Sequence, residues 1–196
     1  MIRFVRWPKG TGKSSIIRAV YENLKEYYSV KILVEKELDL YRNESKQLLT
    51  DHKESLNKDV EVKLLHLLAK GRYEIGKKYI QNSNFDIILM DRWYPSDGVF
   101  RLFHSFEECL KINLEHHVIQ PDIVIATVCD PEISFQRALT RSDGLRSLVI
   151  DNFQDHVEST NRFHQVALDQ NWFVLNTEKS INFVTELVIE KLKGLL

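Results

Sequence analysis

The ten residues from Arg6 to Ser15, RWPKGTGKSS, constrain the fold more than any other part of the chain. A hydrophobic run at 2–5 leads into them, and apolar residues at helical spacing follow in 16–28. This order predicts a strand, a tight glycine-bearing turn and a helix. The end of the turn, Gly12-Lys13-Ser14, matches the end of the phosphate-loop pattern G-x-x-x-x-G-K-[ST].

A phosphate loop binds its ligand mainly through its backbone. N–H groups in the turn surround the phosphates of a nucleotide, and the positive end of the helix dipole lies behind them. In this pattern Lys13 reaches the outer phosphates and the Ser14 hydroxyl holds Mg²⁺. A chance match at a helix start is the alternative, but the strand before and the helix after favour phosphate binding.

One position departs from the pattern. The motif asks for glycine five residues before Gly12, where this chain has Trp7. Tryptophan cannot adopt glycine's backbone angles without strain. The loop is retained if Trp7 is extended and its ring turns away from the phosphates, so that Gly10 and Gly12 supply the close approach.

Size and composition narrow the class of protein. The chain has 196 residues, which fits one domain over 1–196, and its net charge of -1 gives no overall attraction to nucleic acid or to an anionic membrane. No apolar stretch approaches the ~20 residues that cross a bilayer. Cys109 and Cys129 are expected to be reduced thiols, and the expected location is the cytoplasm.

The order of apolar segments predicts the fold class. Short apolar runs alternate with helical patterns, which is typical of an α/β protein. We therefore expect a doubly wound five-stranded parallel sheet with helices on both faces, and ligands beyond the carboxyl ends of the strands. The strands are expected at 2–5, 30–34, 86–90, 123–128 and 172–175.

Asp91-Arg92 follows the third apolar run. An acid at the end of a buried strand beside a phosphate loop is well placed to hold Mg²⁺, and Arg92 can bind a phosphoryl oxygen through two hydrogen bonds. A surface ion pair at a strand end is the alternative. The phosphate loop upstream favours a role in phosphoryl transfer.

Arg137, Arg141 and Arg146 cluster between the fourth strand and a long helix. The segment 141–148 is polar and contains glycine, as expected of a lid. An arginine on such a lid would stabilise the charge that develops on a transferred phosphoryl group. An ordinary solvated loop is the alternative.

Two further places carry candidate ligand contacts. Arg72 lies within a predicted helix and is expected either to face a substrate or to lie on a solvated face. Trp93, Tyr94 and Phe100 flank Ser96 just beyond Asp91-Arg92. Aromatic rings there can stack on a base, and packing in the core is the equal alternative.

Together these motifs resemble the thymidylate kinase family of P-loop nucleoside monophosphate kinases, in matching order over nearly the whole chain. The resemblance rests on GTGKSS at 10–15, LLHLLAKGR at 64–72, DRWYPS at 91–96, and PD at 121–122 followed by DPE at 130–132 and Arg137. The resemblance implies that the chain has the fold of a P-loop NTPase of the nucleotide kinase type.

The resemblance implies an ATP- and Mg²⁺-dependent phosphotransferase that acts on a small nucleotide acceptor, and family members are commonly homodimers. It implies that Arg92 binds the acceptor's phosphate, Asp91 organises metal-bound water, and Arg141 or Arg146 is the lid arginine. The ATP-binding residues would be Gly10, Thr11, Gly12, Lys13, Ser14, Ser15 and Arg137. The acceptor-binding residues would be Lys9, Leu68, Arg72, Arg92, Ser96 and Phe100.

The departures from the family pattern affect recognition of the acceptor more than binding of ATP. Lys9 replaces an acid of the phosphate loop, Leu68 replaces the phenylalanine that stacks on thymine, and EKE at 35–37 replaces the usual Arg-Glu-Pro. The activity that the resemblance implies is transfer of the ATP γ-phosphoryl group to dTMP or a related nucleotide.

Two alternatives remain. A deoxynucleoside kinase would use Glu35 or Glu37 as a base toward the sugar hydroxyl. A nucleotide-binding protein without turnover is suggested by Trp7 and Lys9.

Overall fold

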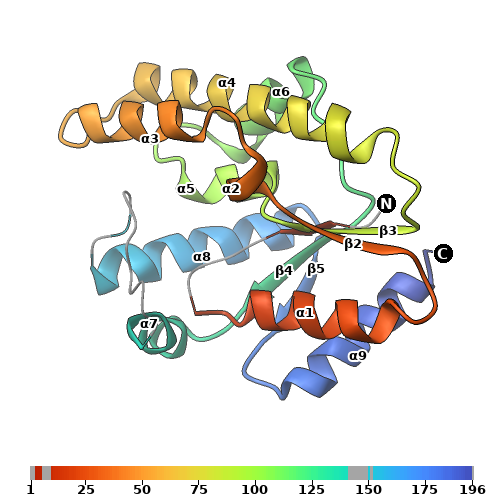
Figure 1. The fold of residues 1–196 in the computed structure, drawn as a ribbon. Coiled ribbons are helices and arrows are strands. Elements are labelled where there is room, and N and C mark those ends of the chain that lie inside the picture. The colour runs from red at the N-terminus through yellow and green to blue at the C-terminus, as the bar shows by residue number, and fades with distance from the viewer. Residues whose placement is uncertain (1–2, 6–9, 141–149, 151, 196) are drawn as a thin grey trace.

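The computed structural model describes residues 3–5, 10–140, 150 and 152–195 (Figure 1). Parallel strands alternate with helices along the described chain, as the sequence predicts. The strands are β1 (Arg3–Val5), β2 (Val30–Val34), β3 (Ile87–Asp91), β4 (Val124–Val128) and β5 (Phe173–Asn176). The helices are α1 (Lys13–Leu24), α2 (Glu35–Leu38), α3 (Arg42–Asp51), α4 (Lys58–Ile75), α5 (Asp97–Phe100), α6 (Phe106–Glu115), α7 (Pro131–Leu139), α8 (Phe153–Asp169) and α9 (Ile181–Lys193).

The strands form two hydrogen-bonded parallel ladders. One has the order β1-β4-β5, and the other pairs β2 with β3. In the second ladder Val30 lies opposite Ile87 and Val34 opposite Asp91. The ladders lie side by side, with β1 against β3. Five parallel strands are confirmed, but within the described residues no ladder joins β1 to β3 into the single sheet that we expected. The described β1 has only three residues, Arg3–Val5, to offer to a neighbour on either edge.

Alternating residues of β3 pack against helices on opposite sides, as expected for a strand covered on both faces. Ile87 and Leu89 belong to a core shared with α1 and α9. Ile88 and Met90 belong to a core shared with α4 and α6. Figure 1 shows α1 and α9 below the strands and α4 and α6 above them. The predicted helices on both faces are therefore confirmed.

Helix starts set the positions of the site-bearing elements. Asn57 caps α4 by accepting hydrogen bonds from the N–H groups of Asp59 and Val60. Asp130 caps α7, and Pro131 occupies the first helical position, where proline is favoured. A π-helical segment, Gly76–Ile80, prolongs α4 toward β3. Within the described ranges, no helix combines the length and the apolarity needed to cross a bilayer.

Candidate active site

The described end of the turn between β1 and α1, residues 10–12, contains two glycines with positive φ angles, as a tight phosphate-binding turn requires. Gly12 precedes α1 with a φ of 76°, and Gly10 has a φ of 99°. A Cβ atom on Gly10 would lie 1.8 Å from the carbonyl oxygen of Ser134 in α7. Only glycine allows the loop to pass so close to α7. The hydroxyl groups of Thr11 and Thr127, at the end of β4, share a hydrogen bond of 3.0 Å. The loop is therefore fixed against the carboxyl end of β4.

The start of α1 brings two predicted groups together. Lys13 is the first residue of α1, and its buried ammonium group forms an ion pair with the carboxylate of Asp91, the last residue of β3. Ser14 and Ser15 are exposed in the first turn. The hydroxyl of Ser14 and the carboxylate of Asp91 supply the hard oxygen donors that Mg²⁺ prefers. No group of three or more His, Cys, Asp or Glu side chains suited to a metal occurs in the described chain.

Arg92 follows β3 with a φ of 73°, which is unusual for a residue with a side chain. Strain of this kind costs about 1–3 kcal/mol and is found most often at functional sites. The guanidinium carbon of Arg92 lies 5.7 Å from the centroid of the Phe100 ring. This strained turn aims Arg92 into the cavity described next.

A cavity of about 150 Å³ lies between α3, α4 and α5, beside the carboxyl ends of β2 and β3; we call it the α3–α5 cavity. It brings together five predicted acceptor residues: Leu68, Arg72, Arg92, Ser96 and Phe100. The other lining residues are Glu35, Lys36, Asp39, Arg42, Ser45, Lys46, Leu49, Leu64, Asp97 and Arg101.

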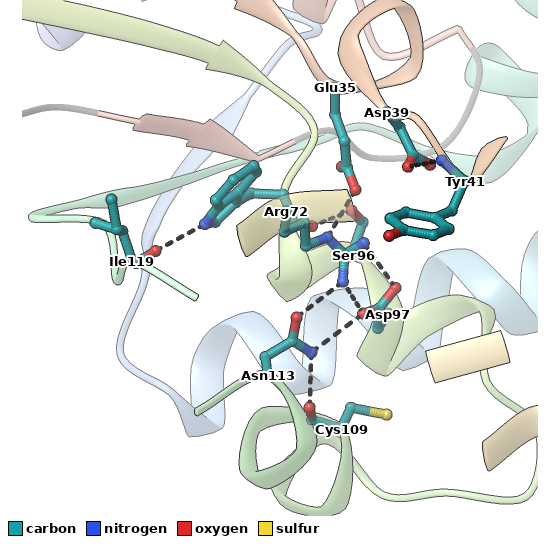
Figure 2. Close-up of polar contacts among 10 residues, drawn as sticks. Glu35, Asp39, Tyr41, Arg72, Ser96, Asp97, Cys109, Asn113 and Ile119 are labelled. Atoms are coloured by element: carbon teal, nitrogen blue, oxygen red, sulfur yellow. Dashed lines mark hydrogen bonds and ion pairs between the residues drawn. The ribbon is translucent and has the colours of Figure 1, made fainter. Parts of the chain in front are cut away.

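Arg72, which lines this cavity, is the centre of a buried polar network (Figure 2). Its Nε donates to Glu35 at 2.6 Å, and its two amino groups donate to the Asp97 carboxylate, one of them at 3.1 Å. It also donates to the side-chain oxygen of Asn113 in α6 at 3.1 Å. Arg72 is 3% exposed, so the network is shielded from water.

Burial and charge act in opposite directions within this network. Burial raises the pKa of Glu35 despite the opposing effect of Arg72. Burial alone would lower the pKa of Arg72, but the carboxylates of Asp97 and Glu35 outweigh it and raise that pKa. Burial also raises the pKa of Asp39, whose carboxylate lies so close to α4 that a Cβ on Gly71 would be 2.1 Å from it. Arg72 therefore remains a cation at any physiological pH.

The residues after Arg92 divide between core and cavity. Trp93 is fully buried, and its indole N–H donates to the Ile119 carbonyl at 2.8 Å. Tyr94 is buried in the same core. Of the aromatic residues in this segment, Phe100 lines the cavity. Ser96 lines it too, although its hydroxyl donates to the Trp93 carbonyl. Trp93 and Tyr94 thus follow the core-packing alternative rather than base stacking.

The remaining predicted residues lie elsewhere. Arg137, in α7, donates from one amino group to the Thr177 carbonyl at 3.3 Å, just beyond β5. It does not line the α3–α5 cavity. Lys9, Arg141 and Arg146 lie outside the described residues, as do Trp7 and the predicted lid.

Sequence reasoning missed several residues of the site. Asp97 and Asn113 hold Arg72, while Ser45 and Arg101 line the cavity with it. One signal could have found Asn113, because a polar residue on the buried face of a helix is expected to bind a polar partner. Nothing in the sequence marks Ser45 or Arg101.

Three features are typical of a P-loop phosphotransferase of the nucleotide kinase class. They are the phosphate loop before α1, the ion pair between Lys13 and Asp91, and the cavity beyond the ends of the strands. A family model described as thymidylate kinase matches residues 8–188. The chain therefore belongs to the thymidylate kinase family and is a kinase.

Known relatives agree with this assignment. The chain is 24% identical over 183 residues to a probable thymidylate kinase from Sulfolobus acidocaldarius, covering 90% of this chain and 88% of that one. Its fold is similar to that of thymidylate kinase from Ehrlichia chaffeensis, with a TM-score of 0.67, 20% identity and 98% of each chain covered. It is equally similar to deoxyadenosine kinase from M. mycoides, solved with the products dCMP and dCDP, with a TM-score of 0.67, 18% identity and all of each chain covered.

Proposed function

We propose that this protein is a nucleoside monophosphate kinase that transfers the γ-phosphoryl group of ATP to dTMP or a related monophosphate, with Mg²⁺. The charge of the α3–α5 cavity is the observation that carries the proposal. Six basic and three acidic side chains line it. A phosphate monoester carries roughly 1.5–2 negative charges at neutral pH, whereas a nucleoside carries none. The excess of positive charge favours the monophosphate.

The proposed mechanism relies on positioning and on neutralising charge rather than on a covalent intermediate. The backbone of residues 10–15 and the ammonium group of Lys13 hold the phosphates of ATP, and Arg137 also contacts ATP. Ser14 and Asp91 would hold Mg²⁺, which neutralises phosphate charge when it is bound. Arg92, held over Phe100, binds the phosphate of the acceptor.

Parts of the proposal rest on the sequence alone. By resemblance to the family, Arg141 or Arg146 would stabilise the charge on the transferred group, and Lys9 would contact the acceptor. We also propose one kinase domain over the whole chain and a homodimer, by resemblance to the family. A cytoplasmic location fits the two free cysteines, because thiols persist in a reducing compartment.

One observation favours a second candidate function, that of a deoxynucleoside kinase. Glu35 is buried in the α3–α5 cavity, and burial raises the pKa of its carboxyl group, as suits a general base. Glu37, the other candidate base, is exposed and does not line the cavity. Against this role, the Glu35 carboxylate already accepts a hydrogen bond from Arg72.

A panel of acceptors distinguishes the candidates. The purified protein is incubated with ATP, Mg²⁺ and each nucleoside or nucleoside monophosphate in turn, and products are identified by mass spectrometry. We expect ADP and dTDP from dTMP, and no product from thymidine. Product from thymidine alone would favour the nucleoside kinase. Binding of ATP without product from any acceptor would favour a binding protein without turnover.

A Glu35→Gln variant sharpens the comparison. Loss of a general base lowers the rate by about 10²–10⁴-fold. A monophosphate kinase does not need this base, so we expect a far smaller loss for dTMP. A loss in the general-base range with a nucleoside as acceptor would instead support the second candidate.

A further inference from the structure

Arg101 is a buried cation that the proposed mechanism does not use. It directly follows α5, and its backbone N–H donates to the Asp97 carbonyl at 3.0 Å. The residue is 8% exposed and lines the α3–α5 cavity. Its Nε is buried without a hydrogen-bond partner. Within the described chain, no hydrogen bond or ion pair engages any atom of its guanidinium group.

The backbone around Arg101 is held rigidly. Glu61, in α4, is fully buried and accepts hydrogen bonds from the N–H groups of Leu102 at 2.7 Å and Phe103 at 2.9 Å. The same carboxylate binds Nδ1 of His104 at 2.8 Å. The backbone that carries Arg101 is therefore fixed at the cavity wall.

The contrast with Arg72 shows why Arg101 needs a partner. Arg72 makes four hydrogen bonds to protein side chains, and two carboxylates balance its charge. Burying a charge is costly unless it is paired and hydrogen-bonded. A ligand in the α3–α5 cavity can supply the acceptor that the protein withholds from Arg101.

A second buried polar group that lines the same cavity also supports a ligand there. Ser45, in α3, is 5% exposed, and its hydroxyl has no hydrogen-bond partner in the described chain. Arg101 and Ser45 come from different parts of the chain, and both line this cavity. A guanidinium group has donors and no acceptor, and a hydroxyl can donate as well. Both groups can therefore donate hydrogen bonds to oxygen acceptors on one edge of a ligand.

Arg101 also borders another cavity, of about 290 Å³, which lies against α8; we call it the α8 cavity. Glu107, Asp169 and Arg162 line it as well. The two acids disfavour an anion or a carbonyl oxygen there. The excess of basic groups in the α3–α5 cavity makes that side the better site for the ligand.

We propose that Arg101, with Ser45, determines which base the acceptor carries, by binding an oxo group on the base edge. A donor-only group pairs with the oxo group of thymine or uracil and not with the amino group that cytosine carries at the same position. Arg101 thereby selects oxo bases, while Arg92 binds the phosphate. This inference rests on the proposed function for the identity of the cavity.

Equilibrium binding tests the inference separately from turnover. Isothermal titration compares dUMP with dCMP, which differ on this edge of the ring, on the wild type and on Arg101→Gln. We expect the wild type to prefer dUMP. Because a hydrogen bond from a charged donor contributes about 1.5–3 kcal/mol, the variant should bind dUMP roughly tenfold or more weakly. Its affinity for dCMP should change little. Ser45→Ala should reduce the preference by a smaller factor.

Controls separate this role from others. Arg162→Gln removes a cation from the α8 cavity and should leave both affinities unchanged. Without ligand, Arg101→Gln should unfold at the same temperature as the wild type or higher, because the arginine has no protein partner to lose. If Arg101→Gln does not fold, the claim of an unpartnered side chain is wrong. The preference for dUMP over dCMP is then measured on Arg101→Lys, which keeps the positive charge but not the planar guanidinium group. A folded lysine variant with a reduced preference supports a role in selectivity, and an unchanged preference supports a structural role.

Several results would overturn the inference. One is an equal loss of dUMP and dCMP with deoxyuridine unaffected, which would place Arg101 at the phosphate. Another is unchanged dUMP binding in both Arg101 variants. The third is a wild type that prefers dCMP or binds no nucleotide at millimolar concentration. Phosphoryl transfer to dCMP alone would leave the proposed function intact and sink only this inference.

Discussion

The network around Arg72 gives the sharpest test of how this protein is held together. Arg72→Ala removes the cation that forms ion pairs with the buried carboxylates of Glu35 and Asp97. The side chains of these three residues are between 3% and 8% exposed, so water cannot replace the lost partner. We therefore expect the substitution to destabilise the fold and not only to alter the cavity.

The size of the loss follows from the geometry. Breaking a buried ion pair by removing one partner costs about 3–5 kcal/mol. For a chain of this length, each 1 kcal/mol lowers the melting temperature by about 2–4 °C, which gives a decrease of about 6–20 °C. The matched control is Lys58→Ala, because the Lys58–Glu108 ion pair of 3.3 Å lies at the surface with Lys58 61% exposed. Exposed pairs contribute about 1 kcal/mol or less.

Urea denaturation and thermal unfolding, each followed by circular dichroism, measure both variants at pH 7 and pH 5. Without Arg72, burial raises the pKa of Glu35 further. A carboxyl group whose folded pKa exceeds its unfolded pKa stabilises the fold most when protonated, and loses that contribution as the pH rises through the folded pKa. The deficit of Arg72→Ala should therefore shrink at pH 5. A loss no larger than that of Lys58→Ala, or a deficit that grows on acidification, would refute the reasoning.

Two further predictions concern the phosphate loop and the contact between α4 and α6. Gly10→Ala should destabilise the fold at least twice as much as Gly12→Ala in urea and should weaken ATP binding, because a Cβ on Gly10 meets Ser134 while one on Gly12 meets nothing within 4 Å. For Gly12→Ala we expect the ~1–2 kcal/mol cost of left-handed backbone; equal losses would contradict the steric argument. His66 Nδ1 and His116 Nε2 share a hydrogen bond of 2.9 Å, and burial, with the nearby His66, lowers the pKa of His116. Stability should fall as the pH drops below about 6.5, where unfolded histidine gains its proton; melting curves should show a smaller fall for His116→Gln, and an equal fall would exclude the pair as the cause.

The sequence predicts the part of the site that depends on strand order. Lys13 follows the turn after β1, and Asp91 ends β3, so parallel strands bring both to one edge. Their ion pair is therefore a consequence of topology. Likewise, the unbroken apolar run of β3 predicts burial on both faces, and the two cores on either side of it confirm this.

The sequence does not predict contacts that depend on how the helices pack. Asp97 lies 25 residues from Arg72, and Asn113 lies 41 residues from it, on two separate helices. The packing angles and the register of α4, α5 and α6 determine which charged residues contact one another. Helical periodicity in the sequence does not determine these angles or this register. Trp93 illustrates the same limit, since its position beside Arg92 is compatible with a base or with the core.

Arg72 and Arg101 show what partner geometry adds to residue type. Both are buried arginines that line one cavity, and nothing in the letters of the sequence separates them. Carboxylates balance the charge of Arg72, and its hydrogen bonds connect α4 to α2, α5 and α6. Arg101 has its backbone fixed by the hydrogen bonds that Glu61 accepts from the next two residues, but its guanidinium group lacks an acceptor in the described chain. A buried arginine that the fold has balanced shapes a cavity, whereas one that the fold has positioned and left unbalanced is the better candidate to select the ligand.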